Sequence, residues 1–377
     1  MLTILPLKNI CYTSKINSTG SSFVKFKQPD ADCFVSSKNV AFTGSKRLTE
    51  NIEYEQYVNL TEKQKEELRC KYNNFYNLID VNELYSSKYP KEGALPLSKE
   101  RDMQDFLRVA ESYNKYRSNK IICVGRSPKW FLNASIWMKN GIEDYSFAAF
   151  SSYWYSRNHL GLGPKLYKIE ERLPTEKEVS AYRHYMKKIN CDPVSIVRKA
   201  QKSGLPVIIT DYIHSGGGLT SYLDLMSQFA EKAGVLDDFV QSIELFTMGS
   251  VEYLDTLGYV NYFALPTALM PEKLQNYKIK QVYHDMSADV LRSILDNKNT
   301  NECRSTYYPP AAWTVYNPIK YKTGFIPDEK LKDMSKMKLG ASDNFTAAMK
   351  DYRNLMNFRI LDYLYLTGRL KESHKTR

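Results

Sequence analysis

The sequence lacks the features that mark several classes of protein. No apolar run approaches the roughly 18–20 residues that a membrane-spanning helix requires. The apolar start, residues 2–7, is short and has no leading positive charge of the kind that begins a secretory signal. The cysteines are scattered and form no Cys-x-x-Cys pair, so neither a zinc site nor a disulfide framework is indicated. We therefore expect a cytoplasmic protein with reduced thiols and no membrane partner.

Familiar catalytic motifs are also missing. The chain contains no His-Glu-x-x-His motif, no Gly-x-Ser-x-Gly motif and no pair of histidines at metal-ligand spacing. Each of these motifs places a metal or a nucleophile in a defined local geometry. Their absence means that no metal site made directly by side chains is predicted.

Positive charge is in excess, but it is not concentrated in one segment of the chain. The formal net charge is +11, which admits an anionic partner such as a phosphorylated ligand or RNA. The excess is shared by both ends of the chain, and no arginine-rich block or run of interleaved arginines and aromatics stands out. RNA is therefore a candidate partner that the sequence does not favour over a small phosphorylated ligand.

What the chain does contain is a strand, an acid, a glycine-rich loop and a helix in direct succession. Residues 205–209 are apolar or β-branched and are typical of a buried parallel strand, and Asp211 falls where that strand should end. Gly216, Gly217 and Gly218 then remove every Cβ from the turn. Apolar residues at helical spacing follow as far as Gly234, which can cap the helix.

This arrangement suits a phosphate group. Backbone N–H groups of the turn and of the first helical turn point into one small volume, and the helix dipole adds positive potential there. A P-loop fits poorly, because no Gly-Lys-Ser/Thr follows the glycines. A dinucleotide fingerprint also fits poorly, because the glycines are consecutive. An ordinary strand-to-helix turn without a ligand is the remaining alternative.

At these residues the sequence resembles the type I phosphoribosyltransferase family, whose signature is a hydrophobic strand, two acids, three variable residues and Thr-Gly-Gly-Thr. Thr210 takes the place of the first acid, Asp211 keeps the second, and Ser215-Gly216-Gly217-Gly218 replaces Thr-Gly-Gly-Thr. The resemblance implies that Asp211 contacts ribose hydroxyls and is the catalytic residue. It also implies a 5′-phosphate at the loop and helix start, held by Ser215, Gly216, Gly217, Gly218, Leu219 and Thr220.

Two other segments acquire a role through this resemblance. Residues 120–125 are predicted to form the first core strand, and the following Arg126, Ser127 and Lys129 would contact pyrophosphate. The alternative is a solvated basic turn. Residues 151–173 lie where the family has a flexible hood, and Arg157, His159 and Lys165 are the candidate lid residues. The alternative here is a surface insertion without a role.

The functional expectation follows from the resemblance. The chain would bind phosphoribosyl pyrophosphate or a nucleoside monophosphate, with Mg²⁺ carried by the substrate. It would act as a glycosyltransferase that moves the phosphoribosyl group to a nitrogen nucleophile. Because Thr210 removes one carboxylate, a non-catalytic nucleotide-sensing module is the second hypothesis. A third is an RNA- or protein-interaction protein in which the α/β core is a scaffold. The acceptor and the oligomeric state are not predicted.

The expected fold is α/β, with a mainly parallel sheet and helices on both faces. Further strands are predicted at 145–150, 240–248 and 260–265. An amphipathic helix is predicted at 344–370, packed on the sheet. We expect a disordered tail over 1–50, a helical extension over 51–118, the α/β core over 119–300 and a C-terminal extension over 301–377.

Overall fold

The computed structural model describes most of the core and leaves several segments outside the description. The described residues are 54–73, 97, 99–125, 128–148, 150, 174–213, 216–252, 270–294 and 347–372. They form two compact units. The sheet unit comprises Gly93–Ile136 and Asn140–Phe345, and the helical unit comprises Met1–Glu92, Trp137–Lys139 and Thr346–Arg377. The predicted tail at 1–50, lid at 151–173 and strand at 260–265 lie outside the described residues.

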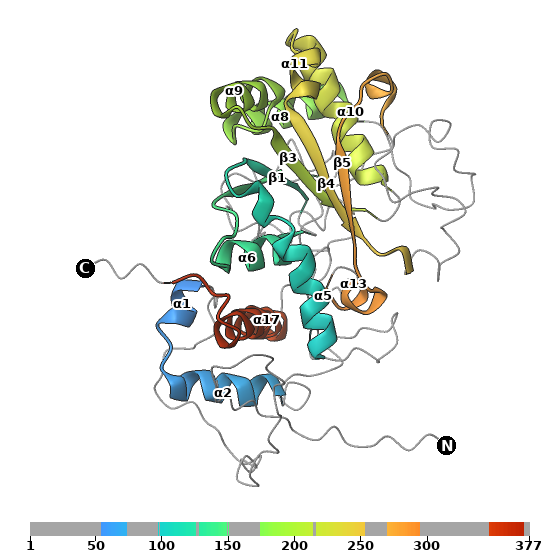
Figure 1. Ribbon diagram of the computed structural model, residues 1–377. Coiled ribbons are helices and arrows are strands. Elements are labelled where there is room, and N and C mark those ends of the chain that lie inside the picture. Colours follow the sequence, from blue (N-terminus) through green and yellow to red (C-terminus); the bar gives the residue numbers. More distant parts are fainter. Residues whose placement is uncertain are drawn as a thin grey trace, which may run out of the picture. The chain divides into compact units, whose positions relative to one another are not determined.

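The sheet unit is built on five parallel strands in the order β2-β1-β3-β4-β5 (Figure 1). The strands are β1 (Ile121–Val124), β2 (Tyr145–Ala148), β3 (Val207–Tyr212), β4 (Ile243–Gly249) and β5 (Gln281–Asp285). The central strands are short apolar runs, as burial on both faces of a parallel sheet requires. The prediction of an α/β fold with a mainly parallel sheet is confirmed.

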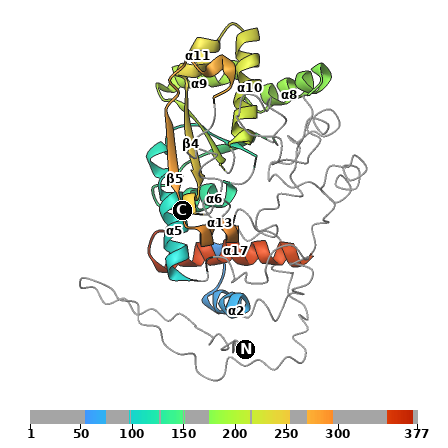
Figure 2. The ribbon, with the colours of Figure 1, turned by 90° about the vertical axis from the view of Figure 1, so that its right-hand side faces the viewer.

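Helices precede, connect and follow these strands. They are α5 (Glu100–Glu111), η2 (Asn114–Tyr116), α6 (Lys129–Trp137), α8 (Glu176–Lys188), α9 (Pro193–Ser203), α10 (Gly217–Lys232), α11 (Leu236–Gln241), η3 (Glu272–Leu274) and α13 (Ala288–Ile294). Figure 2 shows α8 and α10 on the same side of the strands. Side chains of α8, α9 and α10 share one buried cluster with Ile122 and Ile209 of the sheet.

The opposite face of the sheet is covered by other elements. Tyr113, just after α5, stacks on Phe246 of β4 with ring centroids 3.9 Å apart. Phe106 of α5 and Phe131 of α6 lie 4.8 Å apart, and neither residue belongs to the cluster under α8–α10. Because successive strand residues point to opposite faces, the sheet is covered by helices on both sides.

Helix boundaries follow local sequence signals closely. Thr175 and Glu178 form a capping box at the start of α8. Asp192 caps α9, Pro193 opens that helix, and Gly204 ends it in the left-handed conformation with φ 68°. The sequence predicts each of these devices, and the structure confirms them.

The carboxyl-terminal half of the sheet differs from the prediction. Residues 236–241 form helix α11, so β4 starts at Ile243 rather than at Val240. Asp237 and Asp238 in the first turn favour a helix there, because carboxylates are stabilised at a helix N-terminus. The fifth described strand is β5, whose sequence Gln-Val-Tyr-His-Asp carries only one aliphatic residue and gave no strand signal.

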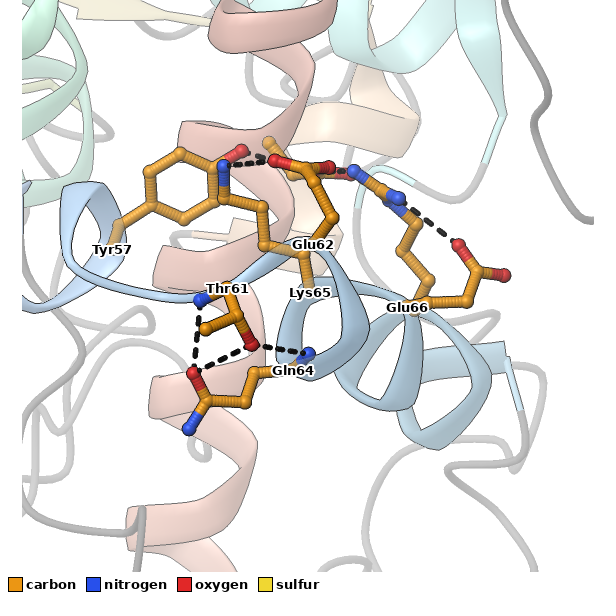
Figure 3. Close-up of polar contacts among 8 residues, drawn as sticks. Tyr57, Thr61, Glu62, Gln64, Lys65 and Glu66 are labelled. Atoms are coloured by element: carbon orange, nitrogen blue, oxygen red, sulfur yellow. Dashed lines mark hydrogen bonds and ion pairs between the residues drawn. The ribbon is translucent and has the colours of Figure 1, made fainter.

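The helical unit brings together segments that are far apart in the sequence. Its helices in the described ranges are α1 (Tyr54–Val58), α2 (Glu62–Asn73) and α17 (Ala347–Leu366). Met138 forms an antiparallel bridge with Leu370 beside them. The sequence Thr61-Glu62-Lys63-Gln64 predicts a capping box at the start of α2, and the structure confirms it: Thr61 N–H donates to Gln64 Oε1 and Gln64 N–H donates to Thr61 Oγ1 (Figure 3).

A buried carboxylate joins the three helices of this unit. Asp362 of α17 is 2% exposed. It accepts hydrogen bonds from Arg69 Nε at 2.8 Å and Arg69 Nη2 at 2.7 Å, both from α2. Tyr57 of α1 donates its hydroxyl to the same carboxylate at 2.9 Å. Lys65 lies over the Tyr57 ring and pairs with Glu62 (Figure 3).

Helix α17 is not the amphipathic helix that the sequence predicts. Residues 356–364 are all buried, so burial covers the whole circumference of the helix there. Asn354, Asn357, Arg359 and Asp362 are among the buried residues. Helices α2 and α1 of the same unit pack against α17. The apolar pattern alone did not reveal this, because polar residues also lie on the buried faces.

Among the helices in the described ranges, none combines the length and the hydropathy that a membrane crossing needs.

Candidate functional site

The segment with the glycines follows β3, and the segment with Arg126 and Lys129 follows β1, the strand next to β3. Strands β1 and β3 are parallel neighbours, with Cys123 paired to Thr210 in the register. From β1 the chain goes through α6 to β2, and from β3 it goes through α10 to β4, on the other side of the sheet order. This is the topological switch point of a doubly wound sheet, where open α/β sheets bind their ligands.

The start of α10 presents backbone donors at this place. Gly216 has φ 75°, a left-handed conformation that other residues adopt only with strain. Thr220 N–H donates to Gly216 O at 2.9 Å and is the first amide of the helix to pair within it. Helix geometry therefore gives the amides of Gly218 and Leu219 no intrahelical acceptor. Together with the helix dipole they make the environment that an anion favours.

The side chains that follow the glycines point inward. Leu219 is 1% exposed and belongs to the buried cluster under α10. Thr220 is fully buried and donates its hydroxyl to Gly216 O at 2.9 Å, and Ser221 donates to Gly217 O at 2.8 Å. Leu219 and Thr220 can thus contribute to a ligand site only through their backbone. Ser215 lies outside the described residues.

Asp211 lies beside this helix start. A Cβ added to Gly218 would lie 3.8 Å from Asp211 Oδ2, so the missing side chain leaves room in front of the carboxylate. Oδ1 accepts a hydrogen bond from Tyr212 N–H at 2.8 Å. Burial raises the pKa of Asp211 well above its usual range, and that one hydrogen bond opposes the shift only in part. The residue nevertheless keeps intermediate solvent exposure at the end of the strand.

Thr210 stands in place of the first acid of the family signature. It belongs to the face of the sheet opposite to the buried cluster under α8, α9 and α10. It is fully buried, and its hydroxyl lies 2.6 Å from the Tyr113 hydroxyl in a hydrogen bond. The neighbours of this pair are aromatic, with Phe246 stacked on Tyr113. A carboxylate at this position would be buried without a cation, which is costly. Thr210 is therefore a core residue of the sheet unit.

The loop after β1 is described at its two ends. Gly125 has φ 63° and donates its N–H to Ala148 O at 2.9 Å, which ends the pairing of β1 with β2. Lys129 opens α6 and is partly exposed. Arg126 and Ser127 lie outside the described residues, as do Arg157, His159 and Lys165 of the predicted lid. Of the predicted pyrophosphate residues, the structure thus places Lys129 alone, at the start of the helix after β1.

The ends of β4 and β5 add residues that the sequence did not indicate. A Cβ on Gly249 would lie 2.7 Å from Ile213 O, so only glycine allows the end of β4 to approach the chain leaving β3 this closely. His284 of β5 stacks on Phe246 with centroids 4.3 Å apart. Burial and the neighbouring Lys115 and Arg108 lower the pKa of His284 to about 4. Gly249 directly follows a strand that the sequence predicts, and that position was the one sequence signal for these residues.

Metal ligands and relatives were sought in turn. The described parts of the chain hold no group of three or more His, Cys, Asp or Glu side chains that could bind a metal ion. Comparison with protein-family models, with curated proteins and with solved structures gave no match.

Proposed function

We propose that the sheet unit binds a phosphorylated ribose, either phosphoribosyl pyrophosphate or a nucleoside monophosphate, at the switch point between β1 and β3. One observation carries the proposal: a Cβ on Gly218, in the first turn of α10, would lie 3.8 Å from Asp211 Oδ2, so the start of the helix and the carboxylate are neighbours. Amides without helical acceptors suit a 5′-phosphate. The adjacent carboxylate suits the ribose hydroxyls, which are hydrogen-bond donors.

In this proposal the residues that follow β1 contact the pyrophosphate of the ligand. Arg126, Ser127 and Lys129 follow β1, the strand that pairs directly with β3. Cations and helix-start amides are the groups that bind pyrophosphate. Arg157, His159 and Lys165 would cover the bound ligand and exclude water. A Mg²⁺ ion would reach the site on the phosphates of the ligand, since the described residues offer no cluster of metal ligands.

Two activities compete within this proposal. As a transferase, the protein would hold the ribose so that a nitrogen nucleophile replaces the pyrophosphate, and ionised Asp211 would stabilise the positive charge that develops on the ribose. As a nucleotide sensor, it would bind the ligand without reaction. The sensor is the second candidate. Thr210 is buried against Tyr113, so Asp211 is the one acid of the signature at the strand end, and this favours binding without reaction.

Substitution of Gly218 by alanine tests the site itself. The new methyl group meets Asp211 Oδ2 at an ordinary contact distance of 3.8 Å, so the protein should fold. Alanine should even stabilise the helix by about 0.5–1 kcal/mol. The same methyl group fills the proposed ligand space. We expect the ligand-induced rise in melting temperature with phosphoribosyl pyrophosphate and Mg²⁺ to be lost in Gly218→Ala.

The matched control is Gly204→Ala, which places a methyl group in open space at the end of α9. Its φ of 68° makes alanine unfavourable there by about 1–2 kcal/mol. This variant should be less stable and still bind. Unchanged binding by Gly218→Ala would contradict the site. Pyrophosphate release with a panel of bases and amines then separates transferase from sensor.

A further inference from the structure

A second surface of the sheet unit carries mainly positive charge. The outward faces of α8 and α9, here called the basic face, hold seven cations over residues 176–203. These are Lys177, Arg183, Lys187, Lys188, Arg198, Lys199 and Lys202, all exposed except Arg183, which is partly exposed. Spacings of three and four residues, as from Arg183 to Lys187 and from Arg198 to Lys202, place them along one side of each helix.

The acids in the same two helices and their caps do not neutralise these cations. Glu178 is buried in the capping box with Thr175, and Asp192 is buried as the cap of α9. Glu176 is exposed in the first turn of α8, where the helix dipole stabilises a carboxylate. Beside α9, helix α11 exposes Asp237 and Asp238, which mark the border of the basic face.

The cations of this face are without ion pairs in the described ranges, unlike many cations elsewhere in the sheet unit. None of its seven cations lies within ion-pair distance of a carboxylate in the described ranges. Elsewhere in the unit, Lys115, Lys232 and Lys278 are exposed and also lie in no ion pair in the described ranges, but six other exposed cations do pair. They are Lys99, Arg101, Arg108, Arg117, Lys273 and Lys280. Like charges gathered without counter-charges repel one another, so a polyanion bound there would relieve the repulsion.

Both helices present their cations away from the same face of the sheet. Tyr182 and Met186 of α8 and Ile196 and Val197 of α9 are buried in one cluster with β1 and β3. The sides opposite these residues therefore both face outward. These apolar residues of α8 and α9 therefore pack in the core. A membrane-bound helix needs exposed apolar side chains to insert, and the basic face has none to offer.

We propose that the basic face binds the sugar–phosphate backbone of a nucleic acid. Lysine and arginine side chains on a rigid helical surface meet phosphates without reading bases, so the binding is electrostatic and independent of sequence. The proposal does not depend on the glycine loop, because the basic face uses other elements. A nucleotide site and a nucleic-acid surface would then occupy one unit.

The test measures binding of a fluorescent oligouridine of about 20 nucleotides between about 50 and 200 mM KCl. The test variant combines Lys187→Gln, Lys188→Gln, Lys199→Gln and Lys202→Gln. We expect at least a tenfold loss of affinity at the lower salt concentration. Because each phosphate contact on a single strand contributes about 0.7 to the slope of log affinity against log salt, the slope should fall by up to about 3.

The matched control removes the same charge from paired positions through Arg101→Gln, Arg117→Gln, Lys273→Gln and Lys280→Gln. It should keep affinity within about threefold and keep the salt slope. Melting temperatures verify that both variants fold, and separate variants of α8 and α9 keep the test decisive if one does not. Equal losses in test and control variants would overturn the proposal, and so would no binding by the unaltered protein. Equal or tighter binding to polyglutamate or to phosphatidylserine vesicles through the same lysines would also overturn it.

Discussion

Each unit of the protein contains a carboxylate with little or intermediate exposure, and the two carboxylates are held in different ways. In the helical unit, Asp362 receives two hydrogen bonds from Arg69 and one from Tyr57. In the sheet unit, Asp211 accepts one backbone hydrogen bond, from Tyr212, and its pKa is raised by burial. Asp362 is nearly saturated with donors that belong to the fold. Asp211 has acceptor capacity left over, next to a helix start and the room left by Gly218.

Hydrogen-bond saturation distinguishes a structural acid from a candidate ligand-binding acid. A buried carboxylate that is fully paired stabilises one arrangement of the elements around it. A carboxylate left with unused lone pairs costs free energy in the absence of a ligand and gains partners when one binds. The predictions below remove partners from each unit and compare the consequences.

The largest effect is expected at Asp362. Asp362→Ala leaves the Tyr57 hydroxyl and the Nε and Nη2 groups of Arg69 without this acceptor, and only Nη1 keeps its pair with Glu66. Breaking a buried pair in this way costs about 3–5 kcal/mol. The triple variant Tyr57→Phe, Arg69→Met, Asp362→Leu removes the carboxylate and both of its donors, and leaves the exposed Glu66 in solvent. It should recover most of that loss, because apolar replacements of buried ion pairs are often neutral or stabilising. Urea unfolding followed by circular dichroism measures both.

Arg117→Ala provides the comparison for an exposed pair. Arg117 pairs with Glu143 at 3.0 Å, and both side chains are more than half exposed. Its loss should change the free energy of unfolding by less than about 1 kcal/mol. If Asp362→Ala proved as mild as Arg117→Ala, the structural role of Asp362 would be refuted.

An intermediate effect is expected for the neutral pair on the sheet. Tyr113→Phe leaves the buried Thr210 hydroxyl without its partner, and an unsatisfied buried group costs about 1–3 kcal/mol. Adding Thr210→Val removes the second hydroxyl and should restore most of the stability. A double-mutant cycle in urea measures the coupling. Strictly additive losses would show that the two hydroxyls are not coupled.

The mildest change, and one of opposite sign, is expected for Asp211→Asn. The folded state holds the Asp211 proton to higher pH than the unfolded state, because burial raises the pKa. Stability of the unaltered protein is therefore lost as the pH rises above the ordinary carboxyl pKa of about 3.9. Asparagine cannot ionise, so the variant should gain stability relative to the unaltered protein from about pH 4 upward and lose turnover or ligand affinity. Parallel stability curves between pH 4 and 8 would rule out the raised pKa.

Local devices of the fold were predictable from the sequence. The capping boxes at Thr61 and Thr175 and the proline and glycine that bound α9 were recognised because each depends on residues a few positions apart. The strand that ends at Asp211 was recognised for the same reason, although it runs one residue further, to Tyr212. Short-range chemistry determines these features, and short-range patterns reveal them.

Long-range features were not predictable. Nothing near Asp362 in the sequence indicates Arg69, which lies 293 positions away. Thr210 could be compared with the acid of a family signature, but its partner Tyr113 and its place on the opposite face depend on packing across the sheet. Strand β5 was missed because its residues are mostly polar, and only its neighbour β4 makes it a strand.

The sequence separation between Arg69 and Asp362 has a consequence for biosynthesis. At translation rates of about 5–20 residues per second, a gap of 293 residues takes about 15–60 s to synthesise. During that interval α1 and α2 have left the ribosome while the helix that carries their common acceptor does not yet exist. The sheet unit, whose described strands all precede α17, can form first. The helical unit is therefore the last part of the described chain to become complete, and the guanidinium of Arg69 stays hydrated until then.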